Sequence, residues 1–182
     1  MNRARLSLFL GFLLLPVAGC MRAPEPEGAF LSFLKGREAW QSTRVELTVT
    51  SLSDDPSTSG DPSTAGEKAV SIVAEHGPTG ETLTFLVLAD RLEGTYPVRV
   101  FGNLSDLDRT LGRERLLPVS NACAPGDRSD TSGSLTFESH DPVAGTVGGS
   151  FIVNVCRVDD ADRAWTLGDG KFRRLSYTTG GG

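Results

Sequence analysis

The stretch TVGGSFIVNVCRV, residues 146–158, shows most clearly how this chain folds. Its side chains alternate with the two-residue period of a β-strand. The alternating sets are Phe151, Val153 and Val155 on one face, and Ile152, Asn154 and Cys156 on the other. The pair Gly148-Gly149 predicts a bulge or bend inside the strand, because interior glycines often mark such points. The stretch therefore predicts a long, bent strand.

Shorter segments with the same period lie on both sides of this strand. They cover residues 45–49, 68–74, 82–88, 95–101, 134–139 and 171–177. Residues 82–88 are largely apolar on both faces, which predicts a central strand covered on both sides. Turn residues separate the segments, so we expect about seven to nine strands. The chain is therefore predicted to be all-β, an antiparallel β-sandwich or partly open barrel with little helix.

Two segments fit either a helix or a strand. Residues 29–40 have apolar side chains near helical spacing, but Gly36 interrupts them, so a short helix and a first strand that packs Trp40 are both open. Within Asn103–Leu117, Leu104, Leu107 and Leu111 also have helical spacing. Gly112 would end such a helix, and a short strand over residues 113–120 would then follow.

The N-terminus has the organisation of a secretory signal. Arg3 and Arg5 precede an apolar run over residues 6–18, which is too short to span a bilayer. The run ends in LPVAGC, residues 15–20, which resembles the bacterial lipobox. The resemblance to lipoproteins implies diacylglycerol on the Cys20 thiol, cleavage before Cys20, and acylation of the new amine. Two or more acyl chains hold a protein stably at a membrane.

The lipobox divides the chain into four parts. Residues 1–19 are the predicted signal peptide, 20–28 a lipidated tether rich in Pro and Glu, 29–177 the β-sandwich domain, and 178–182 a disordered tail. A tandem hexapeptide, residues 55–60 and 61–66, predicts an exposed loop. Met21 follows the lipidated cysteine where enteric lipoproteins retained in the inner membrane carry Asp. We therefore expect a bacterial cell-envelope protein, at the outer membrane rather than the inner one.

Charge and cysteine content narrow the partners. The formal net charge is −5, and loss of Arg3 and Arg5 with the signal makes it −7. An acidic chain of this kind argues against nucleic acid or an anionic membrane surface as partner. With Cys20 lipidated, Cys123 and Cys156 remain as a pair in an oxidising compartment, which predicts a disulfide between them.

No catalytic set is apparent in the sequence, and no cofactor is expected. His76 and His140 both lie in turn-like segments. Ser139, His140 and Asp141 are adjacent, whereas the members of a catalytic triad come from separate segments. Asp159, Asp160, Asp162 and Asp169 are weak calcium candidates, and a solvated acidic loop is the favoured interpretation. Trp40, Trp165 and Tyr96 would serve either a carbohydrate-stacking surface or the core.

Three short motifs extend the resemblance beyond the lipobox. They are GTY at 94–96, SGSLTF at 132–137 and GSF at 149–151. Together they resemble uncharacterised bacterial lipoproteins with small β-sandwich domains, over roughly residues 70–155. This resemblance implies no catalytic residues. We expect a non-enzymatic envelope lipoprotein that acts through protein or glycan contacts. The alternatives are a hydrolase of envelope glycans or lipids and a calcium-stabilised adhesion module.

Overall fold

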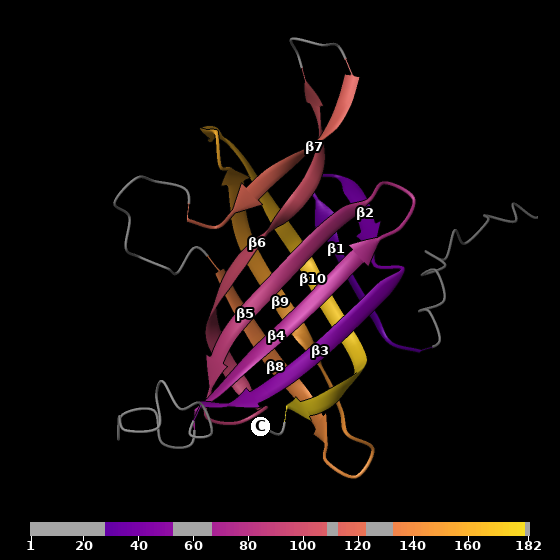
Figure 1. Ribbon diagram of the computed structural model, residues 1–182, viewed down its shortest axis with the longest axis vertical. Coiled ribbons are helices and arrows are strands. Elements are labelled where there is room, and N and C mark those ends of the chain that lie inside the picture. The colour runs from indigo at the N-terminus through magenta and orange to yellow at the C-terminus, as the bar shows by residue number, and fades with distance from the viewer. Residues whose placement is uncertain (1–27, 53–66, 109–112, 123–132, 181–182) are drawn as a thin grey trace, which may run out of the picture.

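The computed structural model describes residues 28–52, 67–108, 113–122 and 133–180, and these contain ten β-strands and no α-helix (Figure 1). The predicted all-β class is confirmed. The strands are β1 (Phe30–Lys35), β2 (Glu38–Gln41), β3 (Arg44–Ser51), β4 (Lys68–His76), β5 (Glu81–Ala89), β6 (Gly94–Asp108), β7 (Arg113–Ser120), β8 (Gly133–Asp141), β9 (Thr146–Arg157) and β10 (Asp160–Gly180).

Strand pairing runs around a ring. β3, β4, β5 and β6 pair in sequence order with antiparallel neighbours. The start of β6 then pairs with β8, β8 with β9, and β9 with β10, all antiparallel. The end of β10 closes the ring on β3 through the one parallel pairing among the described strands. In Figure 1, β3, β4 and β5 cross in front of β8, β9 and β10.

Two long strands change neighbours along their length. β6 pairs with β8 at its start and with β7 over its last eight residues. β10 pairs with β1 over residues 167–173 and then with β3 over residues 177–180. Thr178, Thr179 and Gly180 therefore continue the strand, although the sequence predicts a disordered tail from residue 178. Their backbone pairing with Thr48, Val49 and Thr50 accounts for the difference.

Both ambiguous segments are strands where the structure describes them. Residues 30–41 form the hairpin β1–β2, in which Gly36 takes a left-handed φ of 66° in the turn. Residues 103–108 belong to β6, so the helical alternative is wrong there. Leu104 is fully buried and pairs with Leu117 of β7. Tertiary pairing thus overrides the helical spacing of the leucines.

The inside of the ring is one apolar core. Phe85 and Phe172 are fully buried, and the rings of Phe85 and Phe151 lie 4.7 Å apart. Burial alternates along β5, where Leu83, Phe85 and Val87 face inward. Leu86 and Leu88 face outward and are 38% and 59% exposed, so the prediction of a strand covered on both sides is wrong.

The predicted irregularity at Gly148-Gly149 lies where both neighbouring strands bulge. On β8, Glu138 is the extra residue between the pairs Phe137–Gly149 and Ser139–Gly148. On β10, two residues lie opposite Gly148, between the pairs Phe172–Gly149 and Leu175–Val147. A Cβ on Gly149 would come within 1.9 Å of the Thr136 carbonyl oxygen, so only glycine fits there.

The core explains which apolar residues carry stability. We expect Phe85→Ala to lower the free energy of unfolding by about 3–5 kcal/mol, because it removes a fully buried ring and leaves a cavity. Leu88→Ala, on the same strand but on the outer face, should change it by less than about 0.5 kcal/mol. Urea unfolding of both variants measures the difference. Equal losses would contradict the inward and outward assignment of β5.

Candidate functional site

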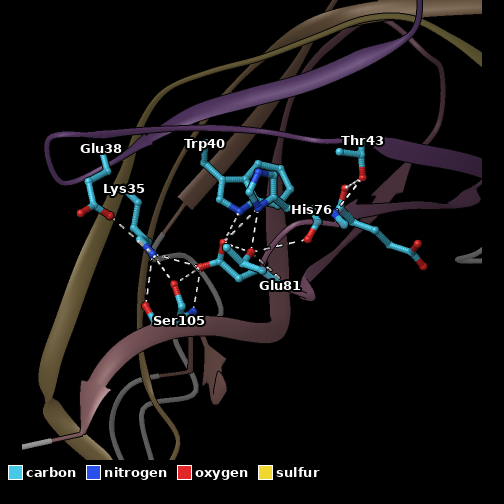
Figure 2. Close-up of polar contacts among 10 residues, drawn as sticks. Lys35, Glu38, Trp40, Thr43, His76, Glu81 and Ser105 are labelled. Atoms are coloured by element: carbon cyan, nitrogen blue, oxygen red, sulfur yellow. Dashed lines mark hydrogen bonds and ion pairs between the residues drawn. The ribbon is translucent and has the colours of Figure 1, made fainter. Parts of the chain in front are cut away.

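A buried carboxylate, Glu81, lies at one end of the ring. It begins β5 directly after the turn over residues 77–80 and is 2% exposed. Figure 2 shows that Lys35, Trp40 and Ser105 converge on it from three other strands. Among the polar and charged residues that the structure describes, only Glu81 and Asn121 are buried. We call Glu81, Lys35, Trp40, Thr79 and Ser105 the Glu81 cluster.

Five hydrogen bonds converge on the two carboxylate oxygens of Glu81. Oε1 accepts from Lys35 Nζ at 3.0 Å, from the Ser105 backbone N–H at 2.7 Å and from the Ser105 hydroxyl at 2.8 Å. Oε2 accepts from Trp40 Nε1 at 2.9 Å and from the Thr79 hydroxyl at 2.8 Å. These donors use the acceptor capacity of the carboxylate, which is about four lone-pair sites.

The donors decide the protonation state of Glu81. Burial raises the pKa of the carboxyl group. The hydrogen bonds from the Ser105 backbone and hydroxyl, from Lys35 and from Thr79 outweigh that effect and lower the pKa from 4.5 to about 2. Glu81 is therefore a charged carboxylate at any ordinary pH. A general base needs a pKa near the working pH, so this group is unsuited to proton abstraction.

Lys35 supplies the positive charge of the cluster. Its side chain is 10% exposed, and Nζ also donates to the carbonyl and hydroxyl oxygens of Ser105 at 3.1 Å each. Glu38 lies 3.8 Å away but is 80% exposed, so the buried partner Glu81 dominates. The ion pair joins the end of β1 to β5 and to β6.

Aromatic packing completes the cluster. Trp40 is 4% exposed, and its ring stacks on Phe33 with centroids 4.6 Å apart and planes 18° apart. The His76 ring also lies near the Trp40 ring, with centroids 5.6 Å apart and planes tilted by 43°. The β1–β2 hairpin is therefore held by a stacked aromatic pair as well as by Glu81. Trp40 packs onto the end of the fold, as one of the two predicted alternatives has it.

His76, Thr79 and Glu81 come close together but not in the order that nucleophilic catalysis requires. His76 Nδ1 lies 2.7 Å from Thr79 Oγ1, and Thr79 donates its proton to Glu81 Oε2. In a triad the base accepts the proton of the nucleophile, and the acid orients the far side of the base. Here the Thr79 hydroxyl instead donates its hydrogen bond to the Glu81 carboxylate, whose pKa of about 2 makes it a very weak base. The arrangement gives no activated nucleophile.

The adjacent residues Ser139, His140 and Asp141 do not form a catalytic set in the described structure. His140 Nε2 lies 3.0 Å from the Tyr177 hydroxyl of β10. Asp141 Oδ1 accepts hydrogen bonds of 2.9 Å from the backbone N–H groups of Val143 and Ala144, which caps the β8–β9 turn. His140 and Asp141 thus each bond to a group outside the Ser139–Asp141 triplet.

Of the calcium candidates, Asp159 lies in the turn between β9 and β10, and the other three lie along β10. Asp159 is bound by Arg157 through two hydrogen bonds of 2.9 and 2.8 Å, which lower its pKa. Asp160 lies 4.0 Å from the same guanidinium. Asp169 is next to Gly170, which pairs with Phe151, six residues along β9 from Arg157 and therefore about 20 Å away. The Asp162 side chain lies outside the described part.

The three aromatic residues proposed for a carbohydrate surface are not equivalent. Trp40 is buried in the Glu81 cluster, and Trp165 is half-buried on β10. The Tyr96 hydroxyl donates to Asp90 at 2.5 Å, and its ring packs edge-on against Phe137. Burial and the Asp90 carboxylate raise the pKa of Tyr96. Core packing accounts for Trp40.

Two of the three cysteines, Cys20 and Cys123, lie outside the described residues. Cys156 is buried near the end of β9, where its Sγ lies 3.4 Å from the Ser120 carbonyl oxygen. Ser120 and Cys156 are direct partners across β7 and β9. The disulfide remains a prediction.

In the part of the chain that the structure describes, no three His, Cys, Asp or Glu side chains gather as metal ligands would. No helix within the same part has the length and apolar character needed to cross a membrane. Comparison with protein-family models, curated proteins and solved structures finds no match.

Reasoning from the sequence missed the Glu81 cluster. Lys35, Glu81 and Ser105 are separated by 46 and 24 residues, and no local period connects them. One signal was present: Glu81 begins a strongly apolar strand directly after a turn, where its side chain shares the inward face with Leu83 and Phe85. A carboxylate on an inward face requires buried donors.

We expect Glu81→Gln to lower the free energy of unfolding at neutral pH by about 3–5 kcal/mol, because Lys35 would stay buried without its counter-charge. The native pKa of Glu81 is depressed, so its contribution is present above pH 4.5 and is lost as pH falls toward 2. Denaturant unfolding at several pH values should show a wild-type loss on the order of 3 kcal/mol over that interval.

The control is Glu38→Gln, which removes an exposed carboxylate 3.8 Å from the Lys35 ammonium group. This change should lower the free energy of unfolding by less than about 0.5 kcal/mol. Equal stability of Glu81→Gln and wild type, or an unchanged acid dependence, would contradict the role of the buried carboxylate.

Proposed function

We propose that this chain is a lipoprotein of the bacterial cell envelope, held at the membrane through Cys20, whose β domain is a non-enzymatic binding or structural module. The observation that carries the proposal is the lipobox-like LPVAGC at residues 15–20, behind a signal of ordinary composition. The first strand begins at Phe30, ten residues beyond Cys20. An extended tether of that length reaches about 35 Å at most, so the domain works close to the membrane surface.

The chemistry of the described residues supports the non-enzymatic part. The interior of the ring is filled by apolar side chains such as Phe85, Leu135 and Phe172. Glu81, whose Oε2 lies 3.7 Å from His76 Nδ1, accepts five hydrogen bonds and has a pKa of about 2. A group in that state is suited to fixing strands and not to transferring protons.

The anchor is tested in a bacterial host that expresses the whole precursor. We expect the wild-type protein in the outer-membrane fraction, with an N-terminal peptide that begins at Cys20 and carries the mass of diacylglycerol and an amide-linked acyl chain. Cys20→Ser should lack the lipid and keep the folded domain, since residue 20 lies ten residues before β1.

An N-terminal peptide of wild type without lipid would contradict the anchor. Lipidated protein recovered in the inner membrane would contradict only the outer-membrane location.

We also propose a disulfide between Cys123 and Cys156. Cys156 pairs across the sheet with Ser120, and three residues of chain span at most about 11 Å. Cys123 is therefore within reach of Cys156, because a disulfide requires the two Cα atoms to lie roughly 4.4–6.8 Å apart. Export through the signal peptide would place both thiols in an oxidising compartment.

The disulfide predicts that the intact mass of the exported protein rises by two hydrogens on reduction. We expect Cys156→Ser to lower the free energy of unfolding by about 3–4 kcal/mol in non-reducing buffer, because the closed loop restricts the unfolded chain. Reduced wild type is the matched control and should unfold like the variant. An unchanged mass on reduction would refute the bond.

A further inference from the structure

A hollow of about 510 Å³ lies on the outer surface over β8, β9 and β10, away from the Glu81 cluster. Glu138 and Ser139 line it from β8, Gly148 to Ser150 from β9, and Lys171 to Arg174 from β10. These are the places where the two neighbouring strands bulge around the Gly148-Gly149 pair. The hollow is thus built by the irregularity that the glycines allow.

The bulge on β10 concentrates positive charge at this hollow. Phe172 and Leu175 both face the core, at 0% and 1% exposure, so the two residues between them are placed on the outside. Those residues are Arg173 and Arg174, both exposed. Arg174 has a φ of 52°, a left-handed conformation that non-glycine residues seldom take. Such strain persists where surrounding structure imposes it, often at functional sites.

The charges at the hollow are unbalanced. Lys171, Arg173 and Arg174 oppose one carboxylate, Glu138, which already accepts a hydrogen bond from the Ser150 hydroxyl. Across the described residues, no hydrogen bond or ion pair occupies the side chains of Lys171 and Arg174. The half-buried Lys171 and the exposed Arg174, beside a hollow with serine hydroxyls, make a site suited to an anion, since Arg and Lys both bind phosphate oxygens.

The position of the hollow relates it to the tether. Arg173 pairs directly with Phe30, the first residue of β1. The chain enters the domain beside the hollow, and Cys20 lies only ten residues earlier. If Cys20 carries lipid, the ten residues between Cys20 and Phe30 span at most about 35 Å, so the hollow lies within that distance of the acyl groups. Headgroup phosphates are then the most concentrated anions near Lys171 and Arg174.

We propose that this hollow binds the phosphate of an anionic phospholipid headgroup in the membrane to which Cys20 anchors the protein, an inference that rests on the proposed lipoprotein function. The net charge of the chain is negative, so an anionic membrane repels most of its surface. The hollow is a local exception. Binding there would dock the domain on the bilayer with the β8–β9–β10 face toward the headgroups.

The test uses the full lipidated protein in micelles of an uncharged detergent. It is titrated separately with short-chain phosphatidylglycerol, short-chain phosphatidylcholine and inorganic phosphate, and backbone amide shifts are followed by NMR. We expect phosphatidylglycerol to bind tightest and to shift amides near Gly148, Lys171 and Arg174. Raising salt should weaken binding, because the contact is largely electrostatic.

Two substitutions identify the cations. Lys171→Gln and Arg174→Gly should each raise the Kd for phosphatidylglycerol about fivefold, and the double variant about twenty-fivefold. Arg174→Gly also removes a strained left-handed residue, so the melting temperature should stay equal or rise. The matched control, Arg37→Gln with Arg113→Gln, removes two cations outside the hollow and should leave the Kd unchanged.

Equal binding of phosphatidylglycerol and phosphatidylcholine would overturn the proposal, as would unchanged affinity of the double variant. Phosphate that binds as tightly as phosphatidylglycerol would show a soluble-anion site and overturn the lipid assignment. The titration measures binding at the hollow, and the same titration of Cys20→Ser, which lacks the lipid, separates that binding from the anchor. A mass spectrum without lipid would contradict the anchor separately.

Discussion

The buried ion pair between Lys35 and Glu81 is the interaction on which the closed end of this fold depends. Glu81 receives donors from β1, β2, β6 and the turn before β5, which no other described carboxylate does. A buried charge without such partners costs several kcal/mol, so the cluster is stable only when all of these strands are in place. The carboxylate therefore couples the β1–β2 hairpin to the ring.

That coupling matters because the β1–β2 hairpin has few other attachments. β1 pairs with β10 along one side and with the four-residue β2 on the other, and β2 is the last strand of the sheet order. The stack of Phe33 on Trp40 supplies apolar contact, and the Trp40 N–H needs a buried acceptor. Glu81 is that acceptor. The same hairpin is the part of the domain that follows the proposed lipid tether.

The sequence predicted the strands better than their arrangement. The two-residue period of residues 82–88 and 151–155 correctly divided the side chains between two faces of a strand, because alternation depends only on local geometry. The helical alternative for residues 103–108 was wrong, because pairing with β7 outweighs the helical spacing of Leu104 and Leu107. The outward exposure of Leu86 and Leu88 depends on what covers the strand, which no local pattern records. Neither the Glu81 cluster nor the basic hollow was predicted, because their members lie on strands distant in sequence.

The glycine pair within β9 shows how a local signal can be correct and still incomplete. Gly148-Gly149 predicted a bend, and the extra residues proved to lie on β8 and β10 instead. That displacement places Arg173 and Arg174 side by side on the outer surface, next to Phe30, where the chain enters the domain. One backbone irregularity thus connects the core position of Gly149 to the charge of the face nearest the proposed anchor.

The most direct measurement is the titration of the Glu81 side chain by carbon-detected NMR, following its carboxyl resonance as pH is lowered. If five donors hold this carboxylate inside the fold, the resonance stays that of the ionised form through pH 4.5 and titrates only near pH 2. A midpoint near the ordinary value of 4.5 would mean that the donors do not engage Glu81 in solution. The account of how the ring end is closed would then be wrong.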